Sequence, residues 1–136
     1  MSKSIPKIQK YMTPHPHTIG KEQKLSIAHE FMSKHQIRHL PVLDGGKLVG
    51  ILTDRDLRLV ESFKDVDPKK LNVEDAMTQT SYTVSPDAPL NEVAAEMAEH
   101  KYGSAVVMQS NQVVGIFTTV DAMRALSELL ETRLTH

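Results

Sequence analysis

The chain has 136 residues, enough for one compact domain or for two small units that share a core. Its net charge is −1, so we expect no broad basic surface for nucleic acid or anionic lipid. It contains no cysteine, which excludes disulfides, thiolate metal ligands and thiol nucleophiles. We expect a cytoplasmic protein, because the N-terminus lacks the apolar core of a secretory signal and no run approaches the roughly 20 apolar residues of a membrane-spanning helix.

In the first half of the chain, hydrophobic periodicity and turn residues predict the order β-α-β-β-α. The predicted elements are a short lead-in helix over 5–11, an extended segment at 18–19, a helix over 25–35, strands at 40–43 and 48–53 around a hairpin turn at 44–47, and a helix over 54–63. Pro41 has no N–H for a sheet ladder, so we place its strand at an edge of the sheet or begin it there.

The second half repeats the first half at a spacing of 65 residues. Positions 8–60 align with 73–125 without a gap, and 12 of the 53 pairs are identical. The second copy therefore predicts a short helix over 73–77, strands at 82–84, 105–109 and 112–118, and helices over 90–102 and 119–132. Gly103 is the expected stop for the first of these helices. Two copies are too few for a solenoid, so we predict a closed pair related by pseudo-twofold symmetry.

A threonine followed three residues later by an aspartate ends one predicted strand of each copy: Thr53 with Asp56, and Thr118 with Asp121. One interpretation is a variant capping box that begins the next helix. The other keeps the cap and adds a ligand, because a carboxylate there can accept both hydroxyls of a ribose and a helix N-terminus can receive a phosphate. The spacing alone does not decide between them.

The repeated motifs resemble a pair of cystathionine-β-synthase (CBS) domains. They are Gly50-Ile51-Leu52-Thr53-x-x-Asp56 and its copy Gly115-Ile116-Phe117-Thr118-x-x-Asp121, the Met-Thr pairs at 12–13 and 77–78, and Ile37-Arg38-His39-Leu40-Pro41-Val42 before the hairpin. The resemblance covers about residues 5–130. It implies an α+β fold of two β-α-β-β-α CBS repeats packed as a pseudo-twofold pair, with domains at 5–63 and 73–132 and a linker at 64–72.

The same resemblance implies a regulatory module rather than an enzyme. Such pairs have two clefts, which in many members bind AMP, ADP, ATP, NAD or S-adenosylmethionine, and two modules commonly associate into a disc-like homodimer. No cofactor is required. Because fewer than ten residues lie outside the repeats at either end, we expect a stand-alone module whose regulated partner is a separate, unknown protein. The alternative is a ligand-free structural module that acts through dimerisation.

Transferred residue by residue, the resemblance implies two sets of ligand-binding positions. The first cleft would use Thr18, Ile19, Ile37, His39, Pro41, Thr53 and Asp56, and the second would use Thr83, Val84, Tyr102, Ser104, Ala105, Thr118 and Asp121. Arg55 and Arg58 are the phosphate candidates, and Val120 replaces Arg55 in the second copy. We therefore expect the two clefts to differ in affinity.

A metal site is the competing hypothesis for the histidines. His15 and His17 would point to opposite faces of an extended segment, and His39 could join only one of them, short of the three or four ligands that a site needs. We therefore predict no metal site. His35 and His100 fall at matching helix ends, where a protonated imidazole would favour the helix dipole. The sequence also lacks the motifs of nucleophile elbows, phosphate loops and zinc proteases.

Overall fold

Each half of the chain folds around a β-hairpin with a two-residue turn. In the computed structural model, which describes residues 4–79 and 81–134, β3 (His39–Asp44) and β4 (Lys47–Thr53) form one hairpin. Strands β6 (Ser104–Gln109) and β7 (Gln112–Thr118) form the other. Both residues of each turn have positive φ: Gly45 and Gly46 in the first, Ser110 and Asn111 in the second. This conformation matches the right-handed twist of the strands, and it confirms both predicted hairpins.

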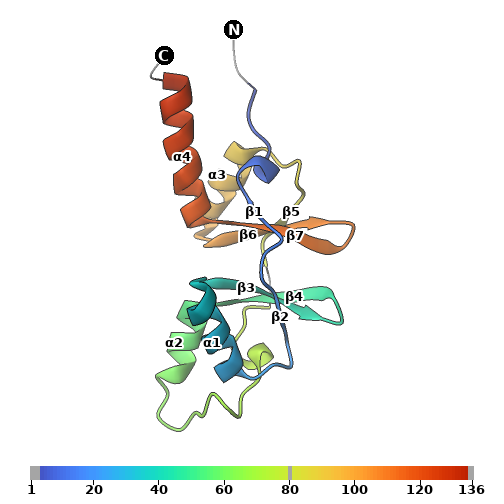
Figure 1. Ribbon diagram of the computed structural model, residues 1–136, viewed down its shortest axis with the longest axis vertical. Coiled ribbons are helices and arrows are strands. Elements are labelled where there is room, and N and C mark those ends of the chain that lie inside the picture. Colours follow the sequence, from blue (N-terminus) through green and yellow to red (C-terminus); the bar gives the residue numbers. More distant parts are fainter. Residues whose placement is uncertain (1–3, 80, 135–136) are drawn as a thin grey trace. The chain divides into compact units, whose positions relative to one another are not determined.

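The remaining elements complete two similar α+β units. In chain order they are the 3₁₀ turn η1 (Ile8–Lys10), β1 (Thr13–Pro14), β2 (Ile19–Gly20), α1 (Leu25–His35), α2 (Asp54–Glu61), the 3₁₀ turn η2 (Val73–Asp75), β5 (Thr83–Val84), α3 (Leu90–His100) and α4 (Thr119–Leu134). One sheet has the strand order β2-β3-β4 and the other β1-β7-β6-β5. In each unit the two helices lie on one face of the sheet (Figure 1). The fold class and the repeated element order are as predicted.

The two compact units do not coincide with the two sequence repeats. The first unit contains residues 17–79 and 81, and the second contains residues 4–16 together with 82–134. The lead-in segment of the first repeat therefore packs with the second repeat: Ile8 is fully buried in the second core, and Ile8 N donates to Ala88 O at 2.8 Å. Val73 is likewise buried in the first core. The predicted boundaries at 5–63 and 73–132 describe the sequence repeats, whereas the packing exchanges their lead-in segments.

The apolar core of each unit lies between its sheet and its two helices. The buried residues of the first core are Ile19, Leu25, Ala28, Met32, Leu40, Val42, Leu52, Leu57 and Val73. Those of the second core are Ile8, Leu90, Val93, Met97, Ala105, Val107, Phe117 and Ala125. Side chains alternate between the two faces of a strand, so the residues between these positions on β3, β4, β6 and β7 face away from the helices.

Two local predictions were wrong. Strand β3, which holds Pro41, is the central strand of its sheet and not an edge. It tolerates proline because β2 pairs only with Val42 and Leu43, so Pro41 lies beyond the end of that short strand. Helix α3 ends at His100 and not at Gly103, and its C-cap Lys101 adopts the left-handed conformation at φ 59°. A lysine accepts that conformation where the helix C-terminus needs it, at a modest steric cost.

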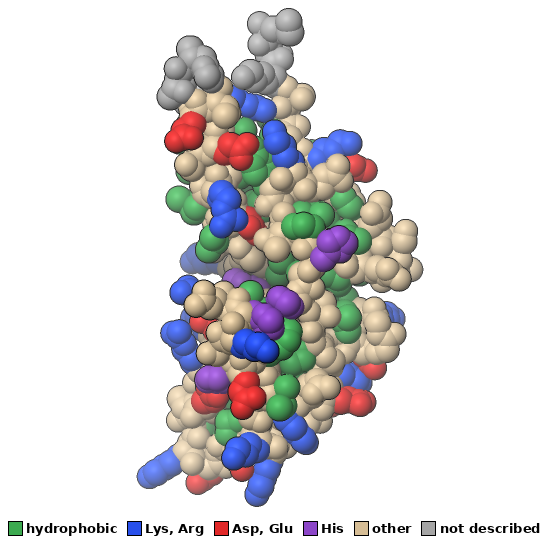
Figure 2. Space-filling view, in the orientation of Figure 1, with side chains coloured by type: hydrophobic (Ala, Val, Ile, Leu, Met, Phe, Trp, Pro, Cys, Tyr) green, Lys and Arg blue, Asp and Glu red, His purple; other side chains and the backbone are tan. Residues whose placement is uncertain are grey.

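The connector between the repeats helps to begin helix α1. Leu25 N donates to Leu71 O at 2.8 Å, and Ser26 N donates to Pro68 O at 3.2 Å. These bonds satisfy N–H groups that a helix cannot pair internally and that the N-cap residue Lys24 cannot cap, because its ammonium group has no acceptor. Across residues 4–79 and 81–134, every helix falls short of the length and hydrophobicity that crossing a bilayer requires. Figure 2 shows charged side chains of both signs interspersed over the face in view.

Candidate functional site

The predicted capping boxes are present at both strand–helix junctions. In the first unit, Asp56 N donates to Thr53 Oγ1 at 3.1 Å, and Thr53 N donates to Asp56 Oδ2 at 3.0 Å. In the second unit, Asp121 N donates to Thr118 Oγ1 at 3.3 Å, and Thr118 N donates to Asp121 Oδ2 at 3.0 Å. The capping interpretation is therefore confirmed for both aspartates. It leaves the ligand interpretation open, because a carboxylate can accept several hydrogen bonds.

The register of the first sheet brings several predicted site residues together. His39 lies opposite Thr53 in the β3–β4 pairing, and Pro41 lies two residues further along β3 on the same face. Asp54 N donates to Arg38 O at 3.0 Å, which ties the start of α2 to the segment before β3. His39, Pro41 and Thr53 thus line the sheet face that points away from the helices. Polar backbone and side-chain groups at this strand end could hold a nucleoside.

Two predicted positions of the first unit contribute differently. The side chain of Ile19 belongs to the apolar core, and that of Ile37 packs against it. Both could approach a ligand only through their backbone atoms. Thr18 directly precedes strand β2, which pairs with β3 at Ile19 and Val42. Its half-buried position beside this strand is compatible with the predicted role.

In the second unit, Ser104 lies opposite Thr118 on the sheet face that points away from the helices. The side chain of Ala105 is fully buried in the helix-facing core, so Ala105 could approach a ligand only through its backbone atoms. Strand alternation places Val106 on the face of Ser104 and Thr118, and Val106 is the repeat counterpart of Pro41. The repeat alignment, which matches position 106 with position 41, could have indicated Val106 from the sequence.

Val84 and Tyr102 of the second unit have different surroundings. Val84 packs against the apolar core, and Thr83 beside it is exposed. The ring of Tyr102 stacks on Tyr82 at a centroid distance of 5.2 Å and on His100 at 5.1 Å. Tyr102 is nevertheless 40% exposed, so part of its side chain is accessible to a ligand.

The phosphate candidates lie on the exposed side of α2. Arg58 makes an ion pair with Asp54 at 3.5 Å, and its side chain is largely exposed, as is Arg55. Exposed i,i+4 pairs contribute little stability, so Arg58 remains available to another anion. Arg58 also lines a cavity of the first unit together with Arg38.

A ring stack joins residues near strand β2 that the sequence reading had treated separately. His17 stacks on His35 at a centroid distance of 4.2 Å, and Phe31 lies 4.5 Å from His35. Desolvation, with smaller contributions from the nearby charges of His17 and Lys34, lowers the pKa of His35 below its ordinary value of 6.5. The prediction of a protonated His35 at the helix end is thus not supported. The lowered pKa favours the uncharged form of His35 at neutral pH.

His15 and His17, which the metal hypothesis would combine, have different surroundings in the described part of the chain. His17 is engaged in the ring stack, and exposed His15 has a left-handed φ of 48°. The group of described residues that gathers three possible ligand atoms within 4.8 Å is Glu96, Glu99 and His100, all exposed on α3. Glu96 already pairs with His100 at 3.3 Å. Such a group on an open helix face is common without an ion.

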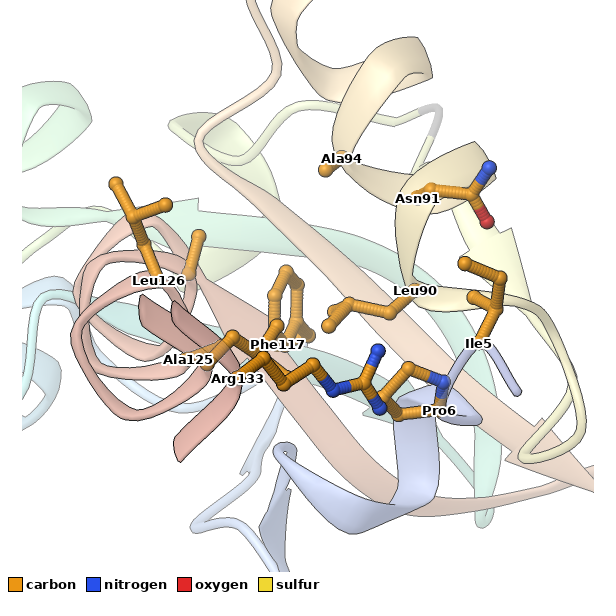
Figure 3. A pocket seen from close by; sticks show the side chains of 11 residues that line it. Ile5, Pro6, Leu90, Asn91, Ala94, Phe117, Ala125, Leu126 and Arg133 are labelled. Atoms are coloured by element: carbon orange, nitrogen blue, oxygen red, sulfur yellow. The ribbon is translucent and has the colours of Figure 1, made fainter. Parts of the chain in front are cut away.

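Two cavities lie on the helical sides of the units. In the second unit, a cavity of about 240 Å³ has Phe117 at its base, with Leu90 from α3 and Leu126 from α4 beside it (Figure 3). Arg133 extends across it and donates to Ser4 O at 3.0 Å. In the first unit, a more polar cavity of about 460 Å³ lies between α1 and α2 and includes Arg38. Neither cavity is lined by Asp56 or Asp121.

Two residues that contact Asp121 were missed by the sequence reading. Thr13 Oγ1 donates to Asp121 across 108 positions of the chain, and Arg124 Nη1 lies 3.3 Å from Asp121 Oδ1. The i,i+3 spacing could have suggested Arg124. Thr13 was visible only as part of the repeated Met-Thr pair, and its partner depends on the tertiary fold.

The comparisons with known proteins identify the class of this fold. The model of the CBS domain family matches residues 8–62 and 73–128. The chain therefore belongs to the CBS domain family, and it contains a tandem pair of these domains.

Two of the similar solved structures match nearly the whole chain. A Vibrio cholerae protein assigned to acetoin utilization (AcuB) has a TM-score of 0.84 and 32% identity, with 94% of this chain and 95% of that chain covered. The CBS domain pair of protein MJ0100, in complex with 5′-methylthioadenosine and S-adenosyl-L-methionine, has a TM-score of 0.80 and 28% identity, with 92% and 98% covered.

Sequence relatives include short and long proteins. Hypoxic response protein 1 of Mycobacterium tuberculosis is 31% identical over 111 residues, which are 81% of this chain and 78% of that protein. Inosine-5′-monophosphate dehydrogenase of Korarchaeum cryptofilum is 31% identical over 134 residues, which are 98% of this chain. The chain spans only 27% of the length of that enzyme.

Proposed function

We propose that this protein is a regulatory module that binds an adenosine compound, namely AMP, ADP, ATP, NAD or S-adenosylmethionine. The observation that carries the proposal is the recurrence of a helix-capping aspartate at the end of a sheet in both units of a CBS pair. The relative MJ0100, whose CBS pair was solved with two adenosine compounds, supports the same ligand class. In this proposal the module has no catalytic role, and it acts on a separate partner.

In the proposed complex, each capping aspartate accepts hydrogen bonds from the ribose hydroxyls. In the first unit, Asp56 and Thr53 contact the ribose, while His39, Pro41 and the backbone near Thr18 enclose the base. Support comes from the shared sheet face of His39, Pro41 and Thr53. In the second unit, Asp121 and Thr118 have the same roles, with Ser104 and Tyr102 beside the base. Arg55 and Arg58 remain the proposed phosphate ligands.

Titration calorimetry with AMP, ADP, ATP, NAD and S-adenosylmethionine tests this function. We expect at least one of them to bind, and Asp56→Asn to weaken binding at the first unit by about 10- to 150-fold. That range corresponds to about 1.5–3 kcal/mol for hydrogen bonds to a charged acceptor.

Asp65→Asn is the control, because it removes the same charge from an exposed position in the connector, outside the capping box and the proposed ligand contacts. It should bind within a factor of two or three of the wild type. If no compound gives heat, and none raises the melting temperature at millimolar concentration, the ligand-free structural module becomes the better account.

We also propose a homodimer that involves helix α4. Four apolar side chains of this helix are at least 45% exposed: Val120, Met123, Leu126 and Leu130. Their spacing places them along one side of the helix, where a second copy would bury them. The expected result is a dimer in sedimentation equilibrium at micromolar concentration.

Met123→Glu should weaken this dimer at least tenfold, because a charge would enter the apolar contact. Gln109→Glu adds the same charge at an exposed strand position and should leave the dimer intact. A monomeric wild type, or equal dissociation constants for the two variants, would contradict the proposed interface.

The cytoplasmic location and the unknown regulated protein remain predictions from the sequence.

A further inference from the structure

The carboxylate of Asp121 already has a full set of hydrogen-bond donors. It accepts from Thr118 N at 3.0 Å, from Thr118 Oγ1 at 3.2 Å and from Arg124 Nη1 at 3.3 Å. The Thr13 hydroxyl lies 3.2 Å from Oδ1 and 3.3 Å from Oδ2 and shares its proton between them. Asp121 is 4% exposed and is the one buried charged residue among those described.

This arrangement leaves no room for the two hydroxyls of a ribose. A carboxylate offers about four lone-pair directions, and four donor groups already occupy them. Two belong to the capping threonine and are part of the helix start. The other two come from Thr13 on strand β1 and from the Arg124 side chain, which is 70% exposed. A ribose could bind Asp121 only by displacing one or both of these.

The first unit differs at the matching positions. Asp56 is half-buried rather than buried, and Thr53 N donates to it as in the second unit. The repeat counterpart of Arg124 is Leu59, which has no donor and is 61% exposed. The counterpart of Thr13 is Thr78, whose backbone makes the same antiparallel bridge, here to Ile51, that Thr13 makes to Ile116. The two aspartates thus share a cap but not the remaining contacts.

We propose that Thr13 and Arg124 form an inhibitory contact that keeps Asp121 from binding ribose until strand β1 releases it. The first unit is then the high-affinity adenosine site, and the second binds only when the Thr13 hydroxyl has moved away. Strand β1 is exposed and pairs with β7 only through Thr13 and Pro14, so its release breaks this short ladder and the adjoining bond from His15 N to Val114 O. This inference rests on the proposed adenosine binding and adds a regulatory role for the N-terminal strand.

Calorimetric titration of the full chain with AMP tests the contact directly. The wild type should show a tight and a weak class of site, of which Asp56→Asn removes the tight one and Asp121→Asn the weak one. Thr13→Val removes the hydroxyl at nearly constant volume, and it should tighten the weak class about five- to tenfold. Thr78→Val is the matched control at the repeat position and should change the weak class by less than twofold.

Arg124→Leu gives the second unit the leucine that the first unit has at the matching position, Leu59. This variant is titrated with 5′-methylthioadenosine, which has no phosphate. The loss of the arginine charge can therefore affect binding only through Asp121. Arg124→Leu should tighten binding at the weak class of site, as Thr13→Val should. It provides a second test if Thr13→Val folds poorly. Urea unfolding checks that each variant is folded.

The possible outcomes separate the two proposals. The inhibitory contact is overturned if neither Thr13→Val nor Arg124→Leu tightens binding at the weak class of site, or if Asp121→Asn removes the tight class. Adenosine binding itself still stands in both cases. If neither AMP nor 5′-methylthioadenosine binds any variant, adenosine binding itself fails, and the contact is then only structural. In that case Thr13→Val and Asp121→Asn should still lower the melting temperature non-additively.

Discussion

Replacing Phe117 by alanine is expected to lower the free energy of unfolding by about 4 kcal/mol, within the range for deletion of a large buried ring. Phe117 is fully buried at the centre of the second core, where it packs with Leu90, Val93 and Ala125. Its removal both loses apolar burial and enlarges the cavity that it already lines. Urea unfolding followed by circular dichroism measures the loss.

Phe63→Ala is the matched control, because the same atoms are removed from a side chain that is 55% exposed. It should change the free energy of unfolding by about 0.5 kcal/mol or less. The interpretation of the second core would be wrong if the two variants lost equal stability. Because the chain forms two compact units, the Phe117→Ala curve should also show whether the first unit unfolds separately.

The second large effect is expected at Gly50. A Cβ atom there would lie 2.5 Å from Thr78 O and 2.8 Å from Met77 Sδ. Thr78 cannot move away freely, since Ile51 N donates to its carbonyl at 3.0 Å and its own N–H donates to Ile51 O at 2.9 Å. Gly50→Ala should therefore destabilise the protein by about 3 kcal/mol, at the upper end of overpacking effects, in the same urea experiment.

Gly115→Ala provides the comparison within the same chain. A Cβ atom at Gly115 would meet Met12 through its Sδ, Cε and Cγ atoms, without a backbone atom among the three nearest. A methionine side chain can change rotamer, so the expected cost is about 1 kcal/mol. A larger loss at Gly115 than at Gly50 would contradict this explanation. The pair also explains why the sequence repeats both the glycine and the Met-Thr pair that packs on it.

Much of the local structure could be predicted because it depends on neighbours in the sequence. The helix Leu25–His35 has the predicted bounds, and both hairpin turns lie where glycine, serine and asparagine predicted them. The capping boxes at Thr53 and Thr118 also follow from a spacing of three residues. Periodicity and cap chemistry act over one or two turns, so they are present in the sequence itself.

The central position of Pro41 and the exchange of lead-in segments could not be predicted in this way. Pro41 is tolerated because strand β2 ends before reaching it, which is a property of the sheet. Ile8 fills the second core although it belongs to the first repeat. Burial of apolar surface selects such long-range partners, and the free energy of burial does not depend on how far apart two residues lie in the sequence.

The sequence by itself determined the repeat, the element order and the two capping aspartates as candidate ligands. It presented Asp56 and Asp121 as equivalent, because each follows its threonine at the same spacing. Only the tertiary structure distinguished them, by bringing Thr13 from the other end of the chain to Asp121 and burying that carboxylate. The reason is that hydrogen-bond saturation depends on which donors the folded chain assembles around a group.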